Sequence, residues 1–183
     1  MPNAIRFHEL GGPEVLKFEE VPARKPGAGE VLLKVEAVGL NRAESMYFHG
    51  AYMEKVNLPS GLGYEAVGKV LAVGDGVDAG LVGKRFGTIP GFSMNQYPVL
   101  AEEAVVPERV LAAVPGSYSA VEGAAVWMQY CTAYGALVLA CVCIGAFFAQ
   151  LLAIHMDVVH TIVLTAIFLT IAYAHRGQVS SAF

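Results

Sequence analysis

The sequence predicts a mainly β domain with short helices, followed by an apolar α-helical tail. Up to residue 120, short stretches of β-forming residues are separated by turn residues at a spacing of about 8–12 residues, a pattern typical of a small barrel or sandwich. Residues 119–137 then have the pattern of a helix. After them, residues 136–174 contain a single formal charge, Asp157. These observations divide the sequence near Gly135.

The predicted strands follow one another closely along the first part of the chain. Residues 30–39 alternate between two faces, with Val31 and Leu33 on the same face, as expected of a half-buried strand. Within residues 63–73, Gly68 predicts a bulge or a close approach of another backbone segment. In order, the predicted strands occupy residues 4–8, 16–21, 30–39, 63–73, a short stretch after the turn at 83–87, 99–105 and 109–114.

Two predicted helices begin with a recognisable cap. Residues 41–48 start at Asn41, with Glu44 three positions into the helix, in the arrangement of a capping box. Ser119 and Glu122 stand in the same relation at the start of the second predicted helix.

Charge and cysteine content exclude several classes of protein. The formal net charge is −4, which argues against a nucleic-acid partner. The first residues lack the apolar segment of a secretory signal. Cys131, Cys141 and Cys143 are odd in number and lack the spacing of a disulfide framework. We therefore expect a reduced, cytoplasmic setting.

Glu65 places a carboxylate at the start of an apolar strand. A group of this kind is usually paired or lies at a cleft, so Tyr64 and Glu65 are candidates for a functional site. The structural alternative is a salt bridge from Glu65 to Arg42 or Arg85.

Several motifs occur in an order and spacing that resemble a known family. They are Pro26-x-x-Gly29-Glu30-Val31, Val38-Gly39-Leu40-Asn41-Arg42-Ala43-Glu44, Gly61-x-Gly-Tyr-Glu-Ala-Val-Gly68, Val73-Gly74-x-Gly-Val, Gly83-Lys-Arg-Phe86 and Thr132-Ala-Tyr-Gly135. No single motif is specific, but the ordered set resembles the N-terminal, GroES-like half of the medium-chain dehydrogenases/reductases. The resemblance covers residues 1 to about 137. It implies a GroES-like barrel and a catalytic domain at residues 1–135.

The family has zinc-dependent and zinc-independent branches, which differ at three positions. Where the zinc enzymes carry Cys, His and Cys ligands, this chain has Asn41, Tyr64 and Met128, which bind zinc poorly. The cysteine-rich lobe that holds a structural zinc is also missing, since residues 1–130 contain no cysteine. The chain therefore resembles the quinone-oxidoreductase branch, and we expect no metal.

This resemblance implies hydride transfer from NADPH to a quinone or to a double bond activated by a carbonyl group, with the cofactor supplying the difficult chemistry. It implies that Asn41 hydrogen-bonds the substrate or the nicotinamide, and that Thr132 lies near the nicotinamide ring. Tyr52 and Tyr64 are the expected donors to the developing enolate oxygen. Glu65 completes the predicted catalytic set.

These assignments have structural alternatives. Asn41 is also a suitable helix cap, and the two roles are compatible. Tyr64 is typical of a half-buried sheet position, and Thr132 on a helix is typical of packing. Met46 stands where the family often has a tyrosine, which weakens any mechanism that relies on one tyrosine.

The sequence after Gly135 departs from the family pattern. A nucleotide-binding half needs a glycine-rich turn between a strand and a helix, but no glycine occurs between Gly145 and Gly177. We therefore expect residues 136–183 to form an apolar helical tail in place of a Rossmann domain. The expectation that follows is a truncated chain that binds no NADPH by itself and is inactive alone.

Three interpretations of this tail are open. The tail is a membrane anchor through residues 136–174, a helical pair that packs on the barrel or on a second copy of the chain, or a non-ancestral reading of a longer gene, for example across a retained intron or a frameshift. Its apolar segments, residues 136–154 and 158–174, approach the length of about 20 residues that a membrane span needs. The alternative function is therefore a membrane-anchored GroES-like binding module without catalysis, with a membrane-associated location.

Overall fold

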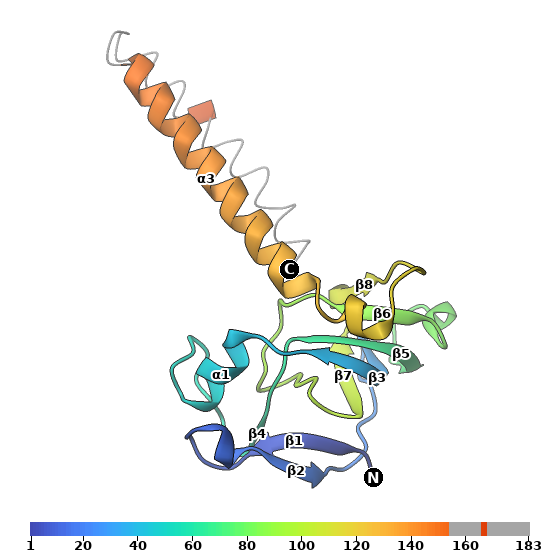
Figure 1. Cartoon of the computed structure of the whole chain (residues 1–183). Coiled ribbons are helices and arrows are strands. Elements are labelled where there is room, and N and C mark those ends of the chain that lie inside the picture. The colour runs from blue at the N-terminus through green and yellow to red at the C-terminus, as the bar shows by residue number, and fades with distance from the viewer. Residues whose placement is uncertain (154–165, 168–183) are drawn as a thin grey trace. The chain divides into compact units, whose positions relative to one another are not determined.

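The computed structural model describes residues 1–153 and 166–167, and the chain divides into two compact units (Figure 1). The first unit is Met1–Gln129 and the second is Tyr130–Phe183. The first contains all the named strands, and the described part of the second is almost entirely helical.

The smaller sheet of the first unit has three antiparallel strands in the order β2-β1-β4. Its central strand pairs with both neighbours, with Ile5 opposite Phe18 and Phe7 opposite Ser60. The strands are β1 (Asn3–Phe7), β2 (Lys17–Glu20) and β4 (Ser60–Gly61). The two strands predicted at residues 4–8 and 16–21 are therefore confirmed within one or two residues.

The larger sheet has five antiparallel strands in the order β7-β3-β5-β6-β8. They are β3 (Glu30–Gly39), β5 (Glu65–Val73), β6 (Arg85–Thr88), β7 (Glu103–Pro107) and β8 (Leu111–Ala113). The two sheets meet where Ile5 N donates to Leu100 O at 2.9 Å, beside an isolated bridge between Ala4 and Ala101. The predicted mainly β fold is confirmed, with the described strands in two sheets and not in one closed barrel.

Gly68 lies where the ladder between β3 and β5 is irregular. It pairs with Val35, and the register shifts between Val35 and Ala37. A Cβ atom at Gly68 would lie 2.4 Å from the carbonyl oxygen of Lys34, too close for any side chain. The prediction of a bulge or a close backbone approach at Gly68 is thus confirmed.

The predicted strand at residues 99–105 begins later than expected. Leu100 lies outside the ladder because its N–H donates to Leu62 O, while its carbonyl accepts from Ile5 N, both at 2.9 Å. Those bonds connect the two sheets, so regular pairing starts only at Glu103, the first residue of β7.

The prediction of a single helix at residues 119–137 is wrong, because two helices occupy that stretch. The first is α2 (Ala120–Gly123), where Ser119 and Glu122 form the predicted capping box. The second is α3 (Trp127–Ala153). The chain breaks between them because Ala124 is buried against Gly39, where a Cβ atom would come within 2.2 Å of the Ala124 carbonyl oxygen. A new helix then starts at Trp127.

The core of the first unit fills the space between the sheets and α1 (Arg42–Phe48). Three short 3-10 turns, Pro13–Val15, Ala79–Leu81 and Glu108–Val110, complete the unit. Each contributes to turns between strands, and two of them bury a valine. The fully buried apolar side chains include Phe7, Val31, Leu33, Tyr47, Leu62, Val70, Met94, Val99 and Val106.

The second unit differs sharply because its apolar side chains are exposed. Along α3, Leu137 is 66% exposed, Leu139 is 64% exposed and Phe147 is 59% exposed. Within Ala120–Ala149, a window of mean hydropathy 2.1 is long and apolar enough to cross a membrane, and none of it is buried. The predicted second apolar segment, residues 158–174, lies outside the described residues except for residues 166 and 167, which are helical.

Candidate functional site

Asn41 lies between β3 and α1 and contacts two buried carboxylates. As the N-cap of α1 it forms a capping box with Glu44, and its backbone N–H donates to Glu44 Oε2 at 2.8 Å. Its side-chain Nδ2 donates to Glu65 Oε2 at 3.2 Å. The predicted helix-capping role of Asn41 is confirmed, and its side-chain amide is held by a second, distant residue.

Glu65 is the first residue of β5 and is buried. Its Oε1 accepts from the backbone N–H of Trp127 at 2.5 Å and from that of Met128 at 3.2 Å. Together with Asn41, these groups give the carboxylate three N–H donors, which compensate for its removal from water.

The alternative that Glu65 pairs with an arginine is wrong within the described part of the chain. Arg85 pairs instead with Glu36, with Nε 2.7 Å from Oε2. Arg85 lies opposite Lys69, four residues along β5 from Glu65, and both of these cationic side chains are exposed, whereas Glu65 is buried. Neither Arg42 nor Arg85 forms an ion pair with Glu65 among residues 1–153 and 166–167.

Glu44 is a second buried carboxylate, and it joins two of the predicted site residues. Its Oε2 accepts from Asn41 N, and its Oε1 accepts from Tyr64 N at 3.1 Å. Burial raises the pKa of the Glu44 carboxyl above its usual range, and the negative charge of Glu65 raises it further. One side chain thus fixes the backbone at residues 41 and 64, the two positions that carry the Asn41 amide and the Tyr64 phenol.

Tyr64 and Tyr52 form part of an aromatic cluster beside these carboxylates. Their ring centroids lie 6.1 Å apart, and Phe92 contacts Tyr64 edge-on with centroids 5.4 Å apart. Burial raises the pKa of the Tyr64 phenol well above its ordinary value, and the neighbouring Tyr52 adds to the effect. The Tyr64 phenol therefore stays protonated at neutral pH and keeps its hydroxyl hydrogen as a donor, in hydrogen-bonding contact with Tyr52.

A network around Glu54 holds the loop that carries Tyr52. Glu54 accepts from the hydroxyl of Ser93, from Met94 N at 3.1 Å and from Asn95 Nδ2 at 2.9 Å. Asn95 in turn accepts from the buried Tyr47 hydroxyl at 2.7 Å. These bonds fix the loop that precedes β4, and with it Tyr52, to the rest of the cluster.

Sequence reasoning missed the residues that hold this arrangement together. The hydroxyl of Thr88 donates to Tyr64 O and accepts from Ala66 N, both at 2.9 Å. The spacing of Asn41 and Glu44 indicated the capping box, but not the second bond to Tyr64. These partners come from strands and loops far apart in the sequence, so no local pattern pointed to them.

The structure brings Asn41, Tyr52, Tyr64 and Glu65 together in the first unit, whereas Thr132 belongs to the second. Thr132 lies on α3 and is exposed to water. Its predicted place beside a nicotinamide ring stays a prediction. Met46, the residue in the position of the family tyrosine, is about one-third exposed at 37%.

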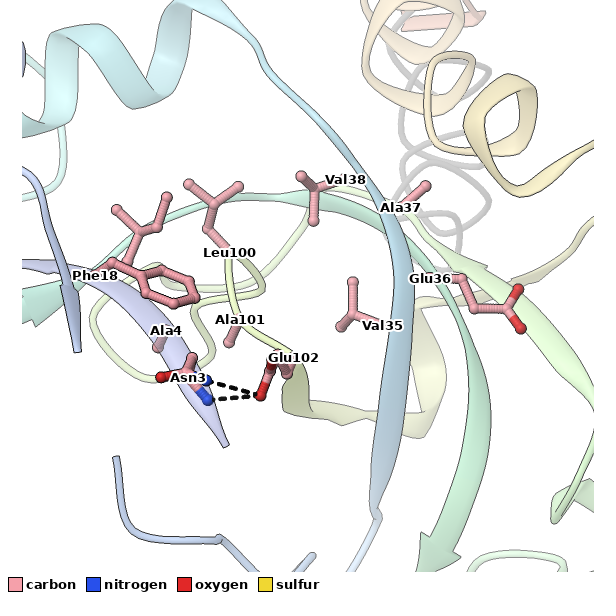
Figure 2. Close-up of a pocket in the computed structure, with 11 residues that line it drawn as sticks. Asn3, Ala4, Phe18, Val35, Glu36, Ala37, Val38, Leu100, Ala101 and Glu102 are labelled. Carbon is pink, nitrogen blue, oxygen red and sulfur yellow. Dashed lines mark hydrogen bonds between the residues drawn. The ribbon is translucent and has the colours of Figure 1, made fainter. Parts of the chain in front are cut away.

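A shallow pocket lies elsewhere, between the two sheets (Figure 2). It encloses about 270 Å³ and is lined mainly by apolar residues of β1, β3 and the segment at residues 100–102. At one side Asn3 donates to Glu102 Oε2 through its backbone N–H at 2.9 Å and through Nδ2 at 3.3 Å. None of the predicted site residues lines this pocket.

Metal-ligating side chains do not gather within residues 1–153 and 166–167. No group of three or more His, Cys, Asp or Glu side chains there is arranged to hold a metal ion. The positions predicted to distinguish the zinc branch are occupied by an amide, a phenol and a thioether, at Asn41, Tyr64 and Met128. The site offers hydrogen-bond donors and aromatic faces.

The chain is similar to known oxidoreductases over its first unit. Residues 27–133 match the alcohol dehydrogenase GroES-like domain. A quinone oxidoreductase of Lama guanicoe is 37% identical over 136 residues, which are 74% of this chain and 40% of that protein. A quinone oxidoreductase of Pseudomonas aeruginosa is 41% identical over 108 residues, 58% of this chain and 33% of that protein.

Solved structures give the same result. The quinone oxidoreductase of Coxiella burnetii superimposes with a TM-score of 0.71 at 30% identity, covering 77% of this chain and 45% of that one. The Escherichia coli quinone oxidoreductase complexed with NADPH has a TM-score of 0.65 at 30% identity, covering 74% of this chain and 40% of that one. The chain thus spans about two-fifths of the length of the relatives it matches. It belongs to the medium-chain dehydrogenase/reductase family, and it shares with the quinone oxidoreductases their GroES-like alcohol dehydrogenase domain.

Proposed function

We propose that residues 1–135 are the substrate-binding half of a cytoplasmic NADPH-dependent oxidoreductase that acts on quinones or on double bonds activated by a carbonyl group. Membership of the family supports this proposal, as does the NADPH complex of the Escherichia coli relative. When bound, NADPH supplies the hydride. The role of this chain is then to bind the carbonyl compound and to orient its oxygen.

The observation that carries the proposal is the cluster in which Glu44 holds Asn41 and Tyr64. The protonated Tyr64 phenol and the adjacent Tyr52 phenol are donors of the kind that stabilise negative charge developing on a carbonyl oxygen. Glu65 already accepts three hydrogen bonds, so its geometry is that of an anchor and not of a free acid or base.

A titration of the 183-residue chain with 1,4-naphthoquinone tests the substrate side, with backbone ¹⁵N–¹H spectra as the readout. We expect saturable shifts at Asn41, Tyr52 and Tyr64. Tyr64→Phe should weaken binding about tenfold, because one hydrogen bond to the carbonyl is lost. Tyr118→Phe is the matched control, since Tyr118 is exposed and lies outside the cluster. Equal binding by all three proteins would contradict the proposal.

We further propose that these 183 residues bind no NADPH by themselves. The support is the lack of any glycine between Gly145 and Gly177, where a phosphate-binding turn is needed. NADPH fluorescence should stay unchanged on addition of the chain, up to millimolar cofactor and with or without detergent. Saturable binding would show that residues 136–183 contribute a nucleotide site, and would overturn this part of the proposal.

A second function, attachment to a membrane without catalysis, is favoured by one observation on α3. Its exposed apolar side chains point to all sides, since Leu137, Leu139, Val142 and Phe147 lie on different faces of the helix. A helix that docks on a protein needs one apolar stripe, whereas a helix that is apolar all round needs an apolar surrounding on every side. Tyr130 and Tyr134 lie near its start, as aromatic residues do at the membrane–water interface.

Flotation with phosphatidylcholine vesicles separates the interpretations of the tail. Insertion predicts that the chain floats with the vesicles and that Val142→Arg releases it, because a charge at the middle of a span costs about 2.5–3.5 kcal/mol. Val114→Arg, in the first unit, should not release a folded chain. A chain that forms a dimer and never floats would support packing of the helix on a second copy instead.

A further inference from the structure

We propose that Glu65 is a positioning residue that sets the orientation of the Asn41 amide and ties it to the start of α3. This inference rests on the proposed function only in that Asn41 faces the bound carbonyl compound. Its structural content is independent of any ligand. It replaces the predicted catalytic role of Glu65 with a role exerted through Asn41.

The contacts of the Glu65 carboxylate are divided between two elements. Oε2 faces the side-chain amide of Asn41, and Oε1 faces the backbone N–H groups of Trp127 and Met128. A carboxylate has no donor, so only the Nδ2 end of the Asn41 amide can face it. The oxygen end is thereby directed elsewhere, and one hydrogen on Nδ2 is left to donate.

The same carboxylate replaces a local cap on α3. The first N–H groups of a helix lack partners within the helix, and a short polar side chain just before the helix usually accepts from them. Here the residues before Trp127 are Ala124, Ala125 and Val126, which have no side-chain acceptor. Glu65, 62 positions before Trp127, supplies the acceptor and a negative charge at the positive end of the helix dipole.

The backbone opposite Glu65 has a glycine, which leaves room for this contact. Gly39 is paired with Glu65 across β3 and β5. A Cβ atom at Gly39 would lie 2.6 Å from Glu65 Oε2 and 2.2 Å from the Ala124 carbonyl oxygen. Any side chain there would therefore push the carboxylate away from Asn41 and displace the residues that lead into α3.

Exchange of the two polar groups tests the proposal. Asn41→Asp places two carboxylates about 3.2 Å apart at this contact, and Glu65→Gln places two NH₂ groups face to face. In the double variant N41D/E65Q, the amide introduced at position 65 can donate to the carboxylate introduced at position 41. The oxygen of that amide still accepts from Trp127 and Met128. The polarity of one hydrogen bond is inverted, and all the others are kept.

The measurements use the full chain in a mild detergent and require no quinone. We expect N41D to lower the folding equilibrium constant about a hundredfold, and the added E65Q change to restore it at least tenfold. E36Q is the matched control, since it also removes one carboxylate but acts at the exposed pair with Arg85. E36Q added to N41D should give no recovery. Trp127, the sole tryptophan, reports on the start of α3 through its fluorescence.

A spectroscopic signature separates positioning from a merely structural role. The side-chain ¹⁵N–¹H pair of Asn41, assigned by its loss in N41D, should shift in E65Q because the Asn41 amide turns its oxygen towards the new NH₂ group at position 65. Absence of recovery in the double variant, or an unchanged Asn41 signal in E65Q, would overturn the proposal. Failure of the quinone titration alone would contradict the proposed function and leave this result intact.

Discussion

The two units of the chain contain the same kinds of apolar residues, but the first unit buries them and the described part of the second exposes them. In the first unit Leu33, Val31 and Phe7 are completely buried between sheets. In the second, Leu139 and Phe147 are more than half exposed along α3. Each buried square ångström of apolar surface contributes about 25 cal/mol to folding, and an exposed one contributes nothing. The first unit thus has its own core, whereas the described part of α3 has none.

The largest expected effect comes from removal of residues 136–183. The shortened chain 1–135 should remain in the supernatant after ultracentrifugation without detergent, because its core is complete without the exposed helix. The full chain should sediment unless detergent or lipid covers α3. Size-exclusion chromatography of both proteins, with and without detergent, measures the difference. Aggregation of the shortened chain would show that residues 136–183 cover apolar surface of the first unit.

A pair of matched substitutions sharpens the comparison residue by residue. Leu33→Ala should lower the free energy of unfolding by about 2–5 kcal/mol, because it leaves a cavity in the core. Leu139→Ala deletes the same atoms from an exposed site and should change it by less than about 0.5 kcal/mol. Urea unfolding in detergent, followed by circular dichroism, gives both values. A large loss from Leu139→Ala would mean that α3 packs against protein.

Most of the β fold was predictable from local pattern, and the exceptions have a common cause. Alternation placed β3 at its observed bounds, and Gly68 indicated the irregular ladder. The helix break at residues 124–126 and the late start of β7 were missed. Both depend on contacts with remote segments, namely Gly39 and Glu65 in the first case and Leu62 in the second.

The candidate site, too, could be predicted from the sequence only where local pattern determines it. Asn41 and Tyr64 were identified through family motifs, and the helix cap at Asn41 through spacing alone. The structural alternative for Glu65 was a salt bridge to Arg42 or Arg85, but its partners are N–H groups. Every residue except proline has a backbone N–H, so the residue type does not reveal which of these groups acts as a donor. A sequence pattern therefore favours side-chain partners and misses this kind of contact.

Gly87→Ala tests the region where α3 begins. A Cβ atom at Gly87 would lie 2.7 Å from Trp127 Nε1 and 3.1 Å from Cδ1, so the indole must move. The expected cost is about 1–3 kcal/mol in the free energy of unfolding, with a shift in the emission of the sole tryptophan. Gly116→Ala is the control, because nothing lies within 4 Å of a Cβ atom there. Unchanged emission in Gly87→Ala would contradict the packing of Trp127.

The smallest predicted effect concerns Glu44 and its dependence on pH. Its pKa is raised in the folded chain above the ordinary 4.5, so protonation favours the folded state. The stabilisation is fully present below about pH 4.5 and is lost as the pH rises through the folded pKa. In Glu44→Gln the group is neutral at every pH, although one of the two hydrogen bonds to N–H is lost.

The informative quantity is therefore the difference in unfolding free energy between the wild type and Glu44→Gln, measured from about pH 4 to about pH 8. As the pH rises, the wild type should become steadily less stable relative to Glu44→Gln, because only the wild type must then bury a charge beside Glu65. Glu30 and Glu102 have pKa values shifted downward and act in the opposite direction, but they are present in both proteins and cancel. A difference that is constant with pH would show that Glu44 keeps an ordinary pKa. The carboxylate that joins Asn41 to Tyr64 would then be better solvated than its burial between α1 and β5 implies.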